Sequence, residues 1–287
     1  GYFKQENPKL HDMKTDNTLP FDYFLSPEMD KIRKQMLNNE IISECHRCNQ
    51  ADELVPYSSP RYNIYNSTKR KLSKVDGVTI KLRIFGSSCN LGCYMCFPQN
   101  SSTRRKEIKE AKIDWRKLNS KGEMYEGQYR EDVNIMGLSI KFVRWNELKK
   151  HLLQNMNYIS KIKITGGEPF LMPRTYEFLK DIPDAYAKKL FISFDTNLTT
   201  TKYKNMYSLE KDILPKFVKP SSGTSQVSLS VSADHFGKKL SWIRYPIDVS
   251  SFEVNLFKYK KYISSIKCTV SILNVYDLKE IEEYYMN

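Results

Sequence analysis

Residues 78–96 read VTIKLRIFGSSCNLGCYMC and join an apolar, strand-like run to a loop that carries three cysteines. The run covers Val78 to Phe85, and Cys89, Cys93 and Cys96 follow it with the spacing C-x3-C-x2-C. In a chain that looks cytosolic, cysteines this close together are more typical of metal ligands than of disulfides. Three cysteines on a [4Fe-4S] cluster leave its fourth iron without a protein ligand. The stretch therefore predicts an iron–sulfur site directly after a strand.

Two other interpretations of the three cysteines stay open on spacing alone. A structural zinc ion needs four protein ligands, usually as two pairs, and Cys45 with Cys48 would supply a further pair. Free cysteines also behave as small hydrophobic residues, so the three side chains would then simply pack in a core. The spacing favours the cluster over both.

A second short strand-like run, from Ile162, ends in Gly166-Gly167-Glu168-Pro169. Alone, this motif would indicate an ordinary turn. After the cysteine loop, however, it makes the chain resemble the radical S-adenosylmethionine (radical SAM) superfamily over roughly residues 76–287. Glycines let a backbone approach a ligand closely, and a carboxylate accepts charge-assisted hydrogen bonds from an ammonium group.

The resemblance implies an enzyme with two cofactors, a [4Fe-4S] cluster on the three loop cysteines and S-adenosyl-L-methionine. Gly166, Gly167 and Glu168 would surround the methionine part of the latter. Reductive cleavage would give a 5′-deoxyadenosyl radical that abstracts hydrogen from a substrate, while the protein orients and shields this chemistry. The resemblance also implies an external electron donor of the flavodoxin or ferredoxin kind.

Further positions resemble cofactor-binding segments of the family. Asn197 follows the third strand-like run and Ser232 ends the fourth, while Arg244 lies in an Ile-Arg-Tyr-Pro run where a guanidinium suits the cofactor carboxylate. Met95 holds a position usually beside the adenine. The cofactor-binding residues implied are Met95, Gly166, Gly167, Glu168, Asn197, Ser232 and Arg244. A turn-forming role for Asn197 and a surface salt bridge for Arg244 stay open.

Three further predictions concern residues in or just after the last two predicted strands. Asp234 is either a substrate or proton contact or a helix cap. Asn274 would end the fifth strand, and Cys268 would lie buried inside it. The catalytic residues stay unknown, and no single tyrosine or cysteine is singled out as a radical quencher.

Apolar strand-like runs alternate with amphipathic segments, which predicts an α/β fold with a parallel sheet. The resemblance implies an incomplete (β/α)6 TIM-like barrel without its sixth strand, and an active site at the carboxyl ends of the strands. Residues 101–144 form a long insertion that would be a lid, a substrate-binding element or a surface loop. The predicted strands lie near residues 78–85, 160–165, 189–195, 226–232 and 267–273, and the predicted helices near 145–153 and 175–182.

The predicted domains are an N-terminal extension, 1–75, and the partial barrel, 76–287. Ser26 and Pro27 indicate a helix start, and apolar residues continue at helical spacing to Leu37. Cys45 and Cys48 then resemble the auxiliary-cluster segment of SPASM/Twitch-like, phage-type members of the superfamily. Half of an auxiliary iron–sulfur site, a zinc half-site with His46, and ordinary or redox-active thiols all stay open.

Composition limits the classes of function. Of 287 residues, 46 are Lys or Arg and 33 Asp or Glu, so the formal net charge is +13. A hydrophobic content of 40% argues against global disorder, and no apolar run approaches the roughly 20 residues of a membrane span, so no membrane partner is expected. A cytoplasmic protein is expected because iron–sulfur chemistry and free thiols suit a reducing compartment. The resemblance implies a peptide or protein substrate. The charge favours an acidic partner, namely nucleic acid, a nucleotide or an acidic peptide, and a solvated lysine-rich surface is the default interpretation of the scattered basic residues. A non-catalytic metal-binding module is the third alternative.

Overall fold

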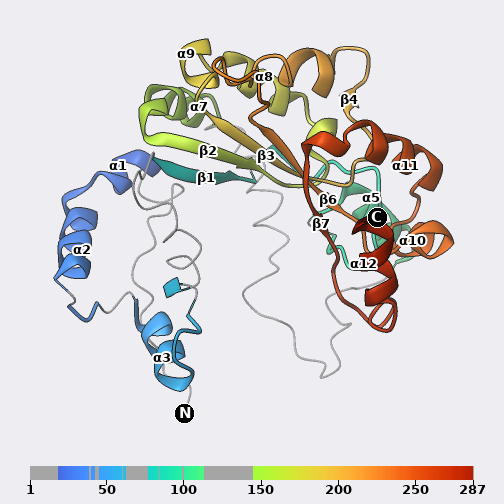
Figure 1. The fold of residues 1–287 in the computed structure, drawn as a ribbon, viewed down its shortest axis with the longest axis horizontal. Helices are drawn as coiled ribbons and strands as arrows, with labels where there is room; N and C mark the ends of the chain where they lie inside the picture. Colours follow the sequence, from blue (N-terminus) through green and yellow to red (C-terminus); the bar gives the residue numbers. More distant parts are fainter. Residues whose placement is uncertain are drawn as a thin grey trace. The chain divides into compact units, whose positions relative to one another are not determined.

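In the computed structural model the chain divides into two compact units (Figure 1). One unit comprises the described residues before Gly77 together with Asn146–Asn155, and the other comprises the remainder. The sequence did not foresee that Asn146–Asn155 joins the first unit, and the predicted boundary at residues 75 and 76 lies outside the described residues. The described residues are 19–38, 40–42, 45–59, 61–62, 77–83, 85–98, 100–112 and 145–286.

The first unit contains the predicted N-terminal helix. The Ser26 hydroxyl accepts a hydrogen bond from the Met29 amide at 3.3 Å, and Pro27 is the first helical residue, which confirms the predicted cap. The Phe21 amide donates to His151 Nε2 at 3.0 Å, which links segments far apart in the sequence. The helices with residues in this unit are α1 (Pro20–Phe24), α2 (Pro27–Leu37), α3 (His46–Leu54) and α7 (Trp145–Gln154).

The second unit is built on a five-stranded parallel sheet, so the fold is α/β. The strands lie side by side in chain order, and each pairs in parallel with the next. They are β1 (Val78–Leu82), β2 (Ile159–Ile164), β3 (Phe191–Thr196), β6 (Val227–Ser232) and β7 (Ile263–Lys267). Four of these strands lie where the alternation of apolar runs predicted them.

Short helices and one small hairpin connect these strands. They include α8 (Pro173–Asp181), which confirms the helix predicted near 175–182, as α7 confirms the one near 145–153. The remaining elements are α5 (Ser102–Glu110), η3 (Met156–Tyr158), η4 (Pro169–Leu171), α8 (Pro173–Asp181), α9 (Asp184–Ala187), β4 (Lys202–Tyr203), β5 (Tyr207–Ser208), η5 (Leu209–Ile213), α10 (Gly237–Ile243), α11 (Val249–Lys258), η6 (Lys260–Tyr262) and α12 (Leu278–Met286). In the part of the chain that the structure describes, none of the helices combines the length and apolar character needed to cross a bilayer.

The core lies on one face of this sheet. Ile164, Phe194 and Leu229 stand in one row across three strands and are fully buried. The ring of Phe170, just before α8, packs 5.0 Å from the ring of Phe194, and α8 and α9 lie on one side of the sheet in Figure 1. Apolar side chains of the strands thus meet the connecting segments on this face.

The predicted fifth strand at 267–273 is wrong in its position. β7 ends at Lys267, level with Ser232 at the end of β6, and Cys268 lies just beyond it and is partly exposed. Asn274 is buried in a turn rather than ending a strand. Side chains bond the backbone amides that a longer strand would use, since Asp234 Oδ1 accepts from Thr269 N at 2.6 Å and Asn274 Oδ1 from Ser271 N at 2.7 Å.

The predicted insertion at 101–144 begins with a regular helix. Ser101 caps α5 by accepting a hydrogen bond from the Arg104 amide at 3.2 Å. The rest of the predicted insertion, residues 113–144, lies outside the described residues.

Candidate metal centre

The cysteine loop follows β1 and is fastened by the start of α5. The Ser102 hydroxyl bonds both the amide and the carbonyl of Cys89 at 3.1 Å, and Thr103 Oγ1 donates to the same carbonyl at 2.7 Å. The buried Ser101 hydroxyl donates to the Leu91 carbonyl at 2.6 Å. Sequence reasoning missed these three hydroxyl residues, although Ser-Ser-Thr after a loop is a typical helix start.

The second half of the loop is fastened by the segment after α10. The Gly92 amide donates to the Tyr245 carbonyl at 2.6 Å, and the Tyr94 amide donates to the Ile243 carbonyl at 2.8 Å. These two bonds bring the intervening Arg244 to the cysteine loop. Its Nη1 lies 3.7 Å from Cys93 Sγ and donates a hydrogen bond to it.

Arg244 is buried, so the surface salt bridge that the sequence left open is wrong. Its Nη2 lies 2.7 Å from Asp234 Oδ2, and Asp234 has no exposed surface. Arg244 Nε is also buried and has no hydrogen-bond partner among the described residues. The guanidinium thus joins a buried carboxylate to a cysteine sulfur, from positions that are remote in the sequence.

Asn197 reaches the first cysteine of the loop. Its Nδ2 donates to Cys89 Sγ at 3.7 Å and to Asn90 Oδ1 at 3.1 Å, while its Oδ1 accepts from the Thr199 amide at 3.0 Å. Asn197 therefore forms the turn that the sequence left open and also contacts a predicted cluster ligand. Donors of this kind, next to the metal-binding sulfurs, orient ligands and tune a metal centre.

The three thiols differ in acidity because their surroundings differ. The Cys93 thiol donates a hydrogen bond to Cys96. This hydrogen bond, and after it burial, raises the pKa of Cys93. The same hydrogen bond lowers the pKa of Cys96 to about 7. Burial raises the pKa of Cys89 to about 11. Because metal ligands are thiolates, loading this loop with a metal must release protons from Cys89 and Cys93.

The donor set of the loop suits a [4Fe-4S] cluster. The three cysteines of a cubane bind three different irons, and the side chains of Asn197 and Arg244 donate hydrogen bonds to two of the three sulfurs. Within the described ranges, no group of three His, Cys, Asp or Glu side chains is arranged to hold a single metal ion. All six cysteines are free, and Cys89 lies close enough to both loop partners to interact with them electrostatically. The loop fits a [4Fe-4S] cluster.

The two glycines at the end of β2 let two loops pack against each other. Gly166 has a φ of +151°, and a Cβ there would lie 2.9 Å from the Gly86 carbonyl oxygen. A Cβ on Gly167 would lie 2.2 Å from the Ser88 carbonyl oxygen. The structure therefore gives both glycines a packing role against the start of the cysteine loop. Their contact with S-adenosyl-L-methionine stays a prediction.

Replacing Gly167 with alanine should destabilise the protein by about 3 kcal/mol, because the added methyl group meets only backbone atoms of Ser87 and Ser88. Gly223→Ala is the control, since nothing lies within 4 Å of its Cβ and its φ of +63° costs only about 1 kcal/mol. Urea unfolding measures both, and the iron content should fall in the first variant alone. Equal losses of stability would contradict this packing role.

Glu168 ties the ends of β2 and β3 together. The carboxylate has no exposed surface and accepts hydrogen bonds from the Asn197 amide at 2.7 Å, from Thr196 Oγ1 at 2.8 Å and from the Phe170 amide at 3.3 Å. Two oxygens offer about four lone-pair sites, so a further donor still has a place. Burial raises the pKa of Glu168 to about 7, against the effect of these hydrogen bonds.

The raised pKa of Glu168 makes stability depend on pH. The folded protein holds this proton more tightly than the unfolded chain, so the stabilisation is complete below pH 4.5 and is lost as the pH rises through about 7. Wild type should lose up to roughly 3 kcal/mol more than Glu168→Gln between pH 5 and pH 8. Urea unfolding at both pH values measures this difference. Parallel pH profiles for the two proteins would show that Glu168 is ionised throughout.

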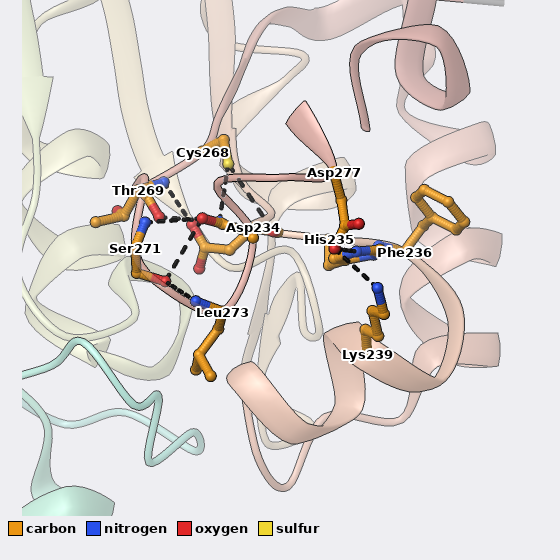
Figure 2. A network of polar contacts seen from close by, with 10 residues as sticks. Asp234, His235, Phe236, Lys239, Cys268, Thr269, Ser271, Leu273 and Asp277 are labelled. Atoms are coloured by element: carbon orange, nitrogen blue, oxygen red, sulfur yellow. Dashed lines mark hydrogen bonds and ion pairs between the residues drawn. The ribbon is translucent and has the colours of Figure 1, made fainter. Parts of the chain in front are cut away.

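A polar network surrounds Asp234 and joins the segment that follows β6 to the segment that follows β7 (Figure 2). Asn274 Nδ2 donates to the Asp234 carbonyl at 3.0 Å and to Cys268 Sγ at 3.3 Å. Phe236, not Asp234, is the N-cap residue of α10, so the helix-cap interpretation of Asp234 is wrong. His235 Nε2 lies 3.1 Å from Asp277 Oδ2, which holds the start of α12.

The remaining predicted residues lie apart from these contacts. Met95 is half-buried between Cys93 and Cys96, and Ser232 is half-buried at the end of β6. Cys45 and Cys48 belong to the other unit, at the start of α3, and their thiols are free.

Comparison with known proteins bears on the same loop. No curated protein matches the chain at a significant level. Residues 75–217 match the family model of a 4Fe-4S single cluster domain, a stretch that includes the cysteine loop, the Gly-Gly-Glu motif and Asn197. The match and the geometry of the loop together support a 4Fe-4S cluster as the cofactor of this chain.

Proposed function

We propose that the chain is a radical SAM enzyme of the SPASM/Twitch-like type. When bound, the [4Fe-4S] cluster would supply an electron that cleaves S-adenosyl-L-methionine to a 5′-deoxyadenosyl radical, which abstracts hydrogen from a substrate. One observation carries the proposal, namely that the cysteine loop and the Gly-Gly-Glu loop are hydrogen-bonded neighbours. The Glu168 amide donates to the Ser88 carbonyl at 2.7 Å, one residue before Cys89.

The order of the strands supports the same proposal. Five parallel strands in chain order are what an incomplete TIM-like barrel requires, and both loops follow the carboxyl ends of adjacent strands. In such barrels the ends of the strands carry the reactive groups.

The chain's own residues would hold and shield the two cofactors. Cys89, Cys93 and Cys96 would bind three irons, with Asn197 and Arg244 donating hydrogen bonds to two of the sulfurs. Thr165 Oγ1 is buried beside the glycines and lacks a hydrogen-bond partner in the described part of the chain, so it is available to a polar group of S-adenosyl-L-methionine.

The test uses protein purified and reconstituted without oxygen. We expect about four irons and four sulfides per chain, and 5′-deoxyadenosine once S-adenosyl-L-methionine and dithionite are added. About eight irons, falling to four in Cys45→Ser/Cys48→Ser, would add an auxiliary cluster. Zinc in place of iron, without 5′-deoxyadenosine, would overturn the proposal and favour a non-catalytic metal-binding module.

The substrate implied by the resemblance is a peptide or protein side chain. A nucleotide or nucleic acid is the second proposal, and the net charge of +13 favours it.

A further inference from the structure

The second face of the parallel sheet is polar, although parallel strands in α/β proteins usually read as continuous apolar runs. Strand pairing puts Lys81, Lys163, Ser193 and Ser228 in one row across β1, β2, β3 and β6. The residues of this face are Thr79, Lys81, Lys161, Lys163, Phe191, Ser193, Asp195, Ser228, Ser230, Ser232, Ser265 and Lys267. We call these residues the lysine face.

Topology explains why a polar face is tolerated here. Right-handed crossovers between strands that follow each other in chain order place their connecting helices on one side of a sheet. That side is the apolar one, where Phe170 packs on Phe194. The lysine face therefore corresponds to the inner surface of a barrel, the side on which a substrate can approach the strand ends.

The charges on this face are unbalanced. It carries four lysines and one aspartate, a formal excess of three positive charges. The ammonium groups of Lys163 and Lys267 both contact the same oxygen, Asp195 Oδ1, the first at 3.1 Å. Within the described residues, Lys81 and Lys161 form no ion pair, and the Lys161 ammonium lies 5.0 Å from the centre of the Phe191 ring.

Three of the lysines are close neighbours. Lys81 and Lys163 are register partners on adjacent strands, whose backbones run about 4.8 Å apart, and Lys161 lies two residues before Lys163 on the same face. Like charges at this spacing repel each other unless an anion lies between them. Burial is the main cause that lowers the pKa of Lys163, and a side-chain hydrogen bond with Lys267 lowers it further. Ser193, Ser228 and Ser230 continue the face onto β3 and β6, where they are buried.

The lysine face adjoins the metal centre. Asp195 lies two residues before Asn197, which donates to Cys89 Sγ. Lys163 lies three residues before Gly166, and Lys267 immediately precedes Cys268. At about 3.3 Å per residue, a group bound on this face would lie within a few residues' length of the cysteine loop.

We propose that the lysine face binds the phosphate of a nucleotide or nucleic-acid substrate, beside the site of radical chemistry. The inference rests on the proposed function. An excess of three positive charges suits a multiply charged phosphate, and lysine binds phosphate as a point charge. The charges of an acidic peptide are spread over separate carboxylates of one charge each, so such a peptide suits neighbouring ammonium groups less well than one multiply charged phosphate does.

The test compares two double variants that each remove two positive charges from the full-length protein, without added S-adenosyl-L-methionine. Lys81→Gln/Lys163→Gln changes the lysine face and leaves Lys267 on Asp195, whereas Lys188→Gln/Lys189→Gln changes two exposed lysines after α9. The probes are inorganic pyrophosphate, adenosine 5′-monophosphate, a fluorescein-labelled single-stranded oligonucleotide and a tetraglutamate peptide. Calorimetry or anisotropy at 50 mM and 200 mM salt measures binding.

We expect the phosphate probes to bind wild type and to bind the lysine-face variant at least about tenfold more weakly, with little change in the control variant. A steep salt dependence for the oligonucleotide alone would identify nucleic acid as the source of the phosphate, and tight binding of the monophosphate would identify a free nucleotide. Equal losses in both variants would mean non-specific attraction to the net charge and overturn the proposal. Tighter binding of tetraglutamate than of the phosphate probes would overturn it too.

The two proposals fail in distinguishable ways. Iron content and 5′-deoxyadenosine formation are measured on the same variants, and circular dichroism checks their folding. If S-adenosyl-L-methionine is cleaved but phosphate binding does not depend on the lysines, the lysine-face proposal is wrong and the radical SAM proposal stands. If phosphate binding depends on the lysines but the protein holds no cluster, the radical SAM proposal is wrong and the lysine face is still a phosphate site. If S-adenosyl-L-methionine displaces the phosphate probes and the lysine-face variant loses cleavage, the lysines serve the cofactor, and the inference is wrong.

Discussion

Cys93→Ser should reduce the iron of anaerobically reconstituted protein from about four atoms per chain to near zero. Cys93 is 3% exposed and lies between the other two loop cysteines, where it accepts a hydrogen bond from Arg244. A serine hydroxyl is a far poorer ligand for iron than a thiolate, because soft sulfur donors select Fe–S clusters. Cys89→Ser and Cys96→Ser should behave alike, since each of the three cysteines would hold a different iron.

Cys268→Ser is the matched control, because Cys268 is a free thiol just beyond β7 that contacts Asn274 rather than the loop. This variant should keep about four irons and the visible absorbance of the wild-type cluster. Iron counting with absorbance spectroscopy decides between the outcomes. Four irons retained in Cys93→Ser would place the cluster on other residues and remove the basis of the metal centre described above.

Arg244→Met should cost about 3–5 kcal/mol of stability, because it leaves the Asp234 carboxylate buried without its cation. Asp234 has no exposed surface, and its 2.7 Å contact with Arg244 is the ion pair of Oδ2. The double variant Arg244→Met/Asp234→Leu should recover most of this loss, since replacing a whole buried ion pair with apolar groups is often nearly neutral. Urea unfolding of the metal-free proteins measures both effects without a contribution from the cluster.

The exposed ion pair of Lys258 and Glu210, at 2.8 Å, provides the comparison. Both side chains are about half exposed, so Lys258→Met should cost less than about 1 kcal/mol. If Arg244→Met costs no more than Lys258→Met, the buried pair of Arg244 and Asp234 does not fasten the cysteine loop. A double variant no more stable than the single one would mean that the loss comes from packing of the Arg244 stem.

Local patterns in the sequence correctly predicted the structural elements that depend only on residues close together in the chain. The alternation of apolar runs predicted four strands of the sheet, and Ser26-Pro27 predicted a capped helix, because periodicity and capping act within one or two turns of chain. The run at 267–273 misled for the same reason. Its residues suit a strand, but the end of β7 is set by pairing with β6 and by side chains of Asp234 and Asn274.

The sequence by itself determined the α/β class and a three-cysteine loop fit for an iron–sulfur cluster, since the spacing of ligands within eight residues is fixed by covalent geometry. The tertiary structure decided what surrounds that loop. Arg244 meets Cys93 and Asn197 meets Cys89 across more than 100 residues of sequence. The lysine face likewise exists only because strand register brings residues of five strands onto one surface. Such contacts depend on how the strands pair and pack, and no local pattern encodes them.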